Sequence, residues 1–377
     1  MNPAAAEIDA KMIGRGRSAY GEPALYLAAT GSALMILLML AALLSVLFAA
    51  AVPSIRRFGG EFLVSTEWRP NPLPVLKLNS HGKPIRDART GMKVVDHNEP
   101  PKFGALASIS GTVQTSAIAL VLAVPLSLGA ALYLVRIARP LLVPPISFLI
   151  EFLAAIPSIA YGLWGMFVLG PWMGGPARWE RIFGMIPVPA GIESRLGAVC
   201  RHVPGLQWVV ERRIDGKLVH IPTTGRDVLT AGLILGIMVV PIITAIARDI
   251  LRNVPLAQIE GTIALGATWW QSCYEMLKFS RSGLFGAVIL GLARAAGETM
   301  AVLMVMGSTP TLTASPLNAG ATMASTLAGE FPEAATNDLY RGALMELALI
   351  LLLMSLAFNI VARYLVVGNA VRPSAGY

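Results

Sequence analysis

The sequence has little charge and very little cysteine. Charged residues make up 14% of its 377 positions, whereas hydrophobic residues make up 55%. A soluble domain carries about 25% charged residues, so this composition excludes an ordinary soluble protein and a disordered one. The apolar residues come in blocks of roughly 20 or more without strict alternation, which predicts membrane helices and excludes an outer-membrane β-barrel.

Cysteine and histidine are too few for a cross-linked or metal-bound fold. The two cysteines, Cys200 and Cys273, form no CxxC pair, and the topology below places them on opposite sides of the membrane. The four histidines lie in predicted loops without HxxxH spacing or an acidic neighbour at ligand spacing: His81, His97, His202 and His220. We therefore expect no disulfide, no metal site and no cofactor.

Motifs for nucleotide or covalent chemistry are also missing. The pattern GxxxxGK[ST] does not occur, because Gly82-Lys83 is followed by Pro84 and Gly216-Lys217 by Leu218. Neither a GxSxG turn nor an HExxH helix is present. The chain is not expected to be an enzyme and has no predicted catalytic residue, so any ATP hydrolysis has to occur on another chain.

Six apolar stretches are long enough to cross a hydrocarbon core of about 30 Å. They are residues 25–52, 105–135, 141–170, 229–247, 283–307 and 342–366. The first is longer than the 7–15 residues usual for the apolar part of a signal peptide, so we expect an uncleaved span. The predicted fold class is an all-α membrane protein with six transmembrane helices.

Basic residues in the short loops set the orientation. Arg136 and Arg139 follow the second span, and Arg248 and Arg252 follow the fourth, which places these loops in the cytoplasm. The N-terminal segment 1–24 and the tail 367–377 lie on the same side. The long loops 53–104 and 171–228 are then extracytoplasmic, and short β-hairpins are expected in them, most clearly around Asp215-Gly216.

Two ionisable residues interrupt the fifth span. Placing Arg294 or Glu298 near a span centre costs about 2.5–3.5 kcal/mol on insertion scales, so such residues normally face a bundle interior or a cavity. Four positions apart, they would share one helix face. Either they form a salt bridge that helps the helix to insert, or Arg294 binds an anion in a pathway while Glu298 orients it, since a guanidinium fork matches phosphate or carboxylate oxygens.

Polar groups elsewhere in the spans allow two interpretations as well. Glu151 lies in the third span, where Pro157 predicts a kink or break. Glu151 and Glu346 can serve a transport pathway or form hydrogen bonds between packed helices. The segment 250–282 has the pattern of short amphipathic helices that either cover the bundle or dock on a soluble partner.

A family resemblance begins in this segment. Glu260-Gly261-Thr262 is followed after three residues by Gly266-Ala267, which resembles the EAA motif of the membrane subunits of ABC importers. In that family the segment is the coupling helix that inserts into a groove of the ATPase. The resemblance therefore implies that Glu260, Gly266 and Ala267 contact an ATP-binding subunit.

More specific motifs lie at 291–302 (GLARAAGETMAV), 155–165 (AIPSIAYGLWG) and 343–350 (ALMELALI). They resemble the PstC-type permease family of the phosphate-specific importer, over all six spans. The resemblance implies phosphate uptake across the bacterial inner membrane, with Arg294 and Glu298 in the phosphate pathway. It also implies three partners besides lipid: an ATP-binding subunit dimer, a PstA-like second permease and an extracytoplasmic phosphate-binding protein. Nucleic acid is not an expected partner.

Three rival functions follow from the same residues. The nearest is an ABC importer permease for sulfate, molybdate or phosphonate. A stand-alone secondary transporter or channel would normally show an internal repeat, and we find none in the sequence. A membrane enzyme is disfavoured by the missing nucleophile and base motifs. Relative to the family, stretches near 76–101 and 174–226 are insertions rich in Arg and Lys.

Overall fold

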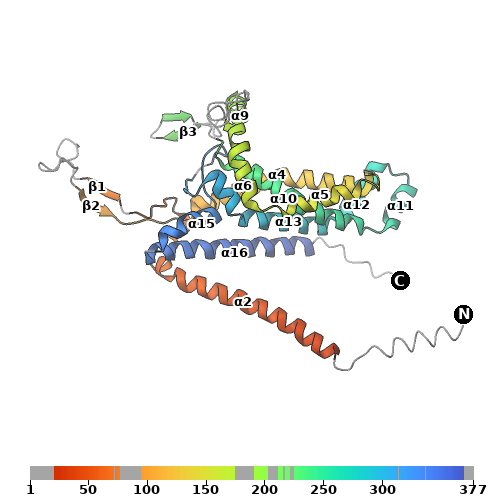
Figure 1. Ribbon diagram of the computed structural model, residues 1–377, viewed down its shortest axis with the longest axis horizontal. Helices are drawn as coiled ribbons and strands as arrows, with labels where there is room; N and C mark the ends of the chain where they lie inside the picture. Colours follow the sequence, from red (N-terminus) through yellow and green to blue (C-terminus); the bar gives the residue numbers. More distant parts are fainter. Residues whose placement is uncertain are drawn as a thin grey trace.

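The computed structural model describes residues 21–71, 73–76, 95–174, 191–202, 211–214, 217–220, 225–312, 314–335 and 337–368. Most of the predicted segments 1–24 and 367–377, and parts of both long insertions, lie outside these ranges. The described part is mainly helical, with long helices running side by side along one axis (Figure 1).

Four helices in the described residues are long and apolar enough to cross a membrane alone. They are α2 (Gly21–Phe58), α4 (Leu106–Leu132) with the π-helical turn η1 (Tyr133–Ile137), α10 (Val228–Arg252) and α16 (Asp338–Gly368). Two bent pairs raise the total to six if each pair is one span: Val143–Ala155 with Ser158–Gly174, at 88°, and Trp269–Phe279 with Arg281–Gly297, at 67°.

The third apolar stretch is broken, as its proline predicted. It consists of α5 (Val143–Ala155), α6 (Ser158–Trp164), the π-helical turn η2 (Gly165–Leu169) and α7 (Gly170–Gly174). Ile156 adopts an extended conformation immediately before Pro157, which is the N-cap of α6. A residue before proline disfavours the helical region, and proline supplies no N–H to continue the ladder. The sharp bend follows from these two effects.

The fifth stretch, 283–307, is not one helix, so this prediction was wrong. The helix α13 (Arg281–Gly297) stops, and α14 (Met300–Met306) begins after Glu298 and Thr299. Glu298 has φ −71° and ψ 126°, which is extended backbone. Glu298 does not continue α13, and its carboxylate accepts from the Ala301 N–H in the first turn of α14.

The core lies where α4, α10, α13 and α14 meet. A Cβ atom at Gly232 of α10 would lie 2.7 Å from the Cβ of Ile118, and one at Gly236 would lie 2.9 Å from Leu122 Cδ2. Gly291 of α13 is equally close to Ile243 of α10. Small residues thus let helix backbones approach closely, which is the usual way of packing helices in lipid.

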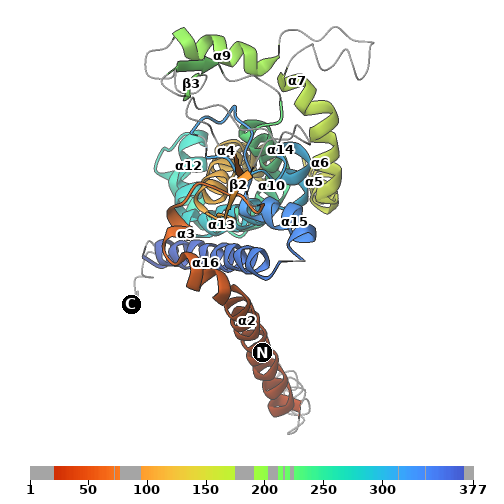
Figure 2. The same ribbon diagram turned by 90° about the vertical axis from the view of Figure 1, so that its left-hand side faces the viewer.

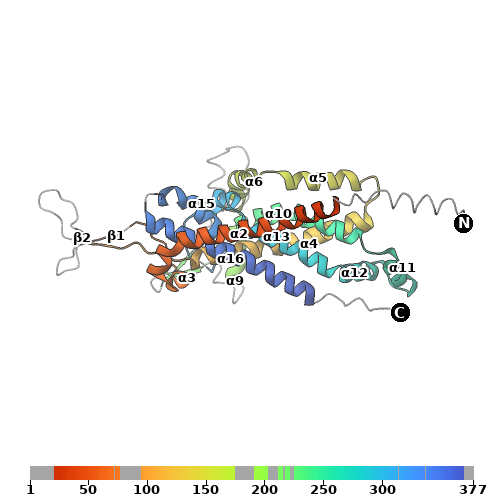
Figure 3. The same cartoon turned by 90° about the horizontal axis from the view of Figure 1, so that it is seen from below.

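The two ends of the bundle differ. The start of α2, the end of α16 and the helices α11 (Leu256–Ala264) and α12 (Trp269–Phe279) lie at one end (Figures 1 and 3). The strands β1 (Leu73–Leu76) and β2 (Val95–Glu99) lie at the other. This arrangement agrees with the predicted grouping of the short basic loops on one face.

The remaining described elements are short. They are α3 (Glu61–Val64), α9 (Ile192–His202), β3 (Glu211–Ile214), β4 (Lys217–His220) and α15 (Met323–Ala334). The pairs β1–β2 and β3–β4 are antiparallel, and the turn residues Asp215 and Gly216 lie outside the described ranges. Seen along the bundle, α2 diverges from the other helices below α16 (Figure 2).

Candidate functional site

The break between α13 and α14 holds the two ionisable residues singled out in the sequence. Arg294 lies in the last turn of α13 with an exposed side chain, whereas Glu298 is 8% exposed. Gly291, packed on Ile243, fixes the rotation of α13 and so the direction in which Arg294 points. A cation in the last turn is also favoured by the negative end of the helix dipole.

Arg294 and Glu298 do not share a helix face. Among the described residues Arg294 forms no hydrogen bond or ion pair, and the Glu298 carboxylate accepts instead from the Ala301 N–H at 3.5 Å. The two side chains were expected to lie one helical turn apart on the same face. They do not, because α13 ends at Gly297, between the two positions. A salt bridge that neutralises the pair inside the helix is therefore absent from this structure.

A groove of about 400 Å³ opens beside the break. Gly297 and Thr299, on either side of Glu298, form one wall, and α15 and α16 form the others: Ala324, Leu327, Ala328, Phe331, Pro332 and Leu351. Arg294 does not line this groove. The groove is mainly apolar, so it suits a packing partner better than a free anion.

Buried hydroxyl groups hold α15 in place as the groove wall. Thr112 Oγ1 of α4 accepts from the Met323 N–H at 2.9 Å, and the hydroxyls of Ser108 and Thr326 lie 3.1 Å apart. Gly111 lies directly against the Ala321 carbonyl, where any side chain would collide. The start of α15 is thereby fixed to α4, with its first N–H groups satisfied inside the protein.

Glu151 forms an ion pair between helices. Its Oε1 atom lies 3.2 Å from Arg248 Nη2, and Arg248 also pairs with Asp249 at 2.9 Å. The helix α10 continues to Arg252, beyond its predicted end at residue 247. Arg248 therefore lies within the helix, and its side chain is 11% exposed. This partner was missed, since the sequence assigned Arg248 to a loop. Among the two interpretations of Glu151, the structure favours packing.

Glu346 lies buried at a contact between two helices. It is buried in α16 close to Ser54 of α2, and a Cβ at Gly342 would lie 3.4 Å from the Ser54 nitrogen. The carboxyl group thus lies at the contact between α2 and α16, with its Oε2 atom unpartnered among the described residues. Pro157 is the N-cap of α6, and its carbonyl accepts from the Ala160 N–H at 3.0 Å.

The predicted coupling segment forms two short helices joined by a tight turn. Gly266 in this turn has φ +87°, a backbone conformation that favours glycine. A capping box between Thr268 and Gln271 starts α12. Glu260 is exposed on α11, and Ala267 is half-buried in the turn.

Apolar side chains point away from the bundle at this turn. Leu265 is 90% exposed, and Trp270 is 69% exposed. The rings of Trp269 and Trp270 meet edge to face, with 4.6 Å between their centroids. Side chains that covered the bundle would be buried against it. The structure therefore favours the alternative in which this segment docks on a partner, since large exposed aromatic residues are typical of binding surfaces.

Sequence reasoning missed a buried carboxyl pair at the opposite end. Glu193 of α9 and Asp227, the N-cap of α10, are both fully buried. Asp227 Oδ1 accepts from the Thr230 N–H at 2.8 Å, and the Glu193 oxygens accept from the Gly225 N–H at 3.2 Å and the Thr230 hydroxyl at 3.4 Å. The spacing Asp227 to Thr230 is a capping signal, whereas nothing in the sequence marks Glu193.

The two carboxyls cannot both be ionised cheaply. Burial raises the pKa of Glu193 to about 9, with the hydrogen bond and the charge of Asp227 adding to this effect. Burial also raises the pKa of Asp227, although its hydrogen bonds oppose the change. At neutral pH Glu193 is therefore the protonated member, and the pair shares one proton.

Within the described residues, no group of three or more His, Cys, Asp or Glu side chains is placed to hold a metal ion.

Comparison with known proteins identifies the family. The family described as "Binding-protein-dependent transport system inner membrane component" matches residues 123–368. A protein of Mesorhizobium japonicum named "Phosphate transport system permease protein PstC" is 33% identical over 345 residues, which cover 91% of this chain and 89% of the relative. A protein of Haemophilus influenzae with the same name is 36% identical and covers 89% of each chain. This chain therefore belongs to the family of binding-protein-dependent transport system inner membrane components, as a multi-pass protein of the inner membrane.

Proposed function

We propose that this chain is the permease subunit of an ABC importer for inorganic phosphate, driven by ATP hydrolysis on a partner subunit. Two relatives that match about nine tenths of the chain carry the name of a phosphate transport permease. The family match covers the helices that contain both the broken fifth stretch and the coupling segment. Substrate is moved and not chemically changed by this chain.

The exposed guanidinium of Arg294 is the observation that carries the assignment of the pathway. It lies in the last turn of α13, after an apolar run that begins beyond Arg281 and Ser282, and it has no partner in the described part of the chain. An unpaired charge at this level is costly unless it faces water or an anion. A guanidinium presents a planar fork that fits two phosphate oxygens. Glu298 acts one step away, by holding the start of α14 and hence the shape of the break.

The proposed topology has six spans: α2, α4, the bent pair Val143–Ala155 with Ser158–Gly174, α10, α13 and α16. The segment 250–282 is then cytoplasmic, and Glu260, Gly266 and Ala267 dock on the ATP-binding subunit dimer. The strand pairs β1–β2 and β3–β4, in the insertions within 53–104 and 171–228, lie outside the membrane near an extracytoplasmic phosphate-binding protein. A PstA-like second permease packs on the apolar groove of α15 and α16, which places Arg294 near the boundary between the two permeases.

Uptake by the reconstituted importer tests this function. The chain is assembled in proteoliposomes with its second permease and ATP-binding subunits, and radioactive phosphate is delivered on the binding protein. Arg294→Lys keeps the charge but loses the fork, so we expect a strong loss of uptake at equal abundance. Arg341→Lys is the matched control, because Arg341 is exposed and pairs only locally with Asp338 at 2.8 Å.

Two results would count against the proposal. Normal phosphate uptake by Arg294→Lys would remove Arg294 from the pathway. Competition by sulfate, molybdate or phosphonate at concentrations where unlabelled phosphate does not compete would assign the importer to another oxyanion.

A further inference from the structure

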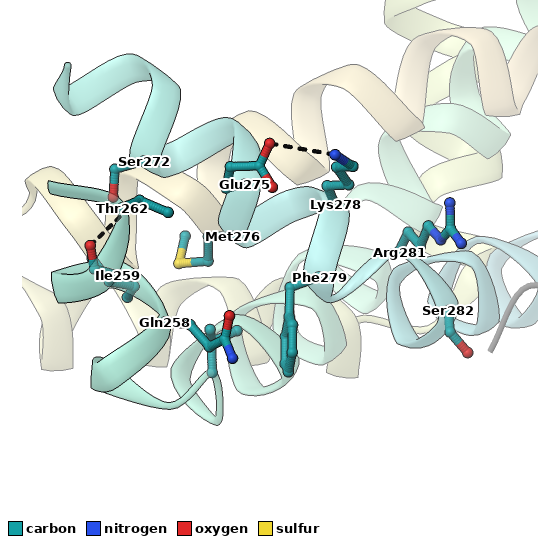
Figure 4. A pocket seen from close by; sticks show the side chains of 11 residues that line it. Gln258, Ile259, Thr262, Ser272, Glu275, Met276, Lys278, Phe279, Arg281 and Ser282 are labelled. Carbon is teal, nitrogen blue, oxygen red and sulfur yellow. Dashed lines mark hydrogen bonds and ion pairs between the residues drawn. The ribbon is translucent and has the colours of Figure 1, made fainter. Parts of the chain in front are cut away.

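A second groove lies at the end of the bundle that carries α11 and α12. Its volume is about 470 Å³, and it runs between α11, α12 and the start of α13 (Figure 4). It is separate from the α13–α14 break, which lies at the far end of α13. Nothing in the pathway proposed above uses it.

The lining has an apolar side and a charged side. Val254, Ile259 and Met276 are buried along the groove, and Phe279 extends beside them. Lys278 and Arg281 supply two positive charges against the single negative charge of Glu275, which pairs with Lys278 at 3.4 Å. The groove is therefore amphipathic with a net charge of one positive unit.

Hydrogen-bonding groups stand beside these charges. Gln258, Thr262 and Ser282 line the groove together with Ser272. Ser272 is 1% exposed, and its hydroxyl oxygen has no partner among the described residues. A buried hydroxyl without a partner costs free energy unless a ligand or water completes its hydrogen bonds.

The position of the groove limits what can fill it. Arg281 is the first residue of α13, and the apolar run of α13 starts immediately after it. Lys278 and Arg281 thus lie where a membrane helix leaves the bilayer, at the depth of lipid phosphates. A free phosphate ion would occupy only a small part of 470 Å³, whereas a lipid head group with the start of its chains would also cover the apolar side.

We propose that this groove binds a phosphate group, with Lys278 and Arg281 as its charged ligands. An anionic phospholipid of the inner leaflet is the source that best matches the two-sided lining. Inorganic phosphate on the same face is the other source of the same chemistry. Because α11 and α12 form both the groove and the exposed turn at Gly266, an occupied groove braces the segment that docks on the partner.

Lipid binding by the assembled importer tests the site directly. The complex is purified in detergent, and retained phosphatidylglycerol is measured by native mass spectrometry during titration with that lipid. A basic residue near the surface contributes about a fivefold effect, so the double variant Lys278→Gln/Arg281→Gln should bind about 30-fold more weakly. Arg139→Gln removes an exposed basic residue at the same end that does not line the groove, and should leave the affinity unchanged.

Two further measurements separate the outcomes. Binding of radioactive inorganic phosphate, lost in the double variant but not in Arg139→Gln, would assign the free ion as the source. In the wild-type complex, phosphatidylglycerol should protect Lys278 from amine acylation, which tests the site even if the double variant assembles poorly. Equal binding of lipid and of phosphate by wild type and double variant, or no protection of Lys278 by either, would overturn the proposal. None of these readouts depends on transport.

Discussion

The shared proton of Glu193 and Asp227 makes the docking of α9 dependent on pH. The folded-state pKa of Glu193, about 9, lies above its ordinary value of 4.5, so between these values the folded protein holds a proton that the undocked segment releases. The stabilisation is complete below pH 4.5 and is lost as the pH rises toward 9. One proton changes the free energy by about 1.4 kcal/mol per pH unit, or about 2.7 kcal/mol between pH 6 and pH 8.

Glu193→Gln is the informative change. Glutamine has nearly the same shape, donates an N–H toward Asp227 and cannot ionise, so it should keep α9 docked while removing the pH dependence. Glu193→Ala should destabilise docking at every pH, because it leaves a cavity and removes the acceptors of the Gly225 N–H and the Thr230 hydroxyl. The prediction therefore rests on the difference in slope between wild type and the glutamine variant.

Cys200 provides the assay. It lies half-buried in α9 and packs against Leu317, so a thiol reagent should react with it faster when α9 leaves the bundle. In a Cys273→Ser background, the labelling rate of wild type divided by that of Glu193→Gln should rise about tenfold per pH unit from pH 6 to pH 8. The ratio cancels the titration of the thiol itself. A ratio that stays flat over this range would refute the assignment of the proton to Glu193.

Three further predictions concern packing and docking. Gly266→Ala and Gly266→Leu should reduce copurification of the ATP-binding subunit to a similar extent, because the strain of about 1–2 kcal/mol comes from φ +87° and the space around Gly266 is open; a strong effect of leucine alone would point to a steric contact instead. Gly111→Val should lower the thermal stability of the purified protein by displacing α15 from α4, with Gly129→Val, which has open space around it, as the unaffected control. Glu151→Gln should change phosphate uptake far less than Arg294→Lys, since Arg248 keeps Asp249 as a partner; equal losses in both would place Glu151 in the pathway.

The sequence predicted the long helices well because apolar length is a strong signal. The starts and ends differ by a few residues: α10 runs to Arg252, where the apolar run had suggested residue 247. A hydropathy pattern assigns charged residues at helix ends to a loop. The helix can nevertheless continue through them, because the apolar stem of an arginine packs along the bundle while its charged group reaches water. The error mattered at Arg248, because it hid the ion pair with Glu151.

Breaks inside spans were predictable only where one residue dictates them. Pro157 restricts its own backbone and that of Ile156, so the bend in the third stretch could be foreseen. The break at Glu298 has no such residue, because Gly297 and Thr299 are both tolerated within helices. It depends on the Glu298 carboxylate reaching the N–H of Ala301, which is a tertiary arrangement. The same applies to Glu193, whose partner lies 34 positions away in the chain.

The close packing of α4 on α10 has a mechanical consequence. With Gly232 and Gly236 pressed against Ile118 and Leu122, these two helices cannot slide past each other without collision, and they must move as one body. Flexing is instead concentrated at the interruptions of the helical ladder, at Ile156–Pro157 and at Glu298–Thr299. When this protein opens and closes, we therefore expect α4 and α10 to move as one rigid unit, with bending at the two breaks.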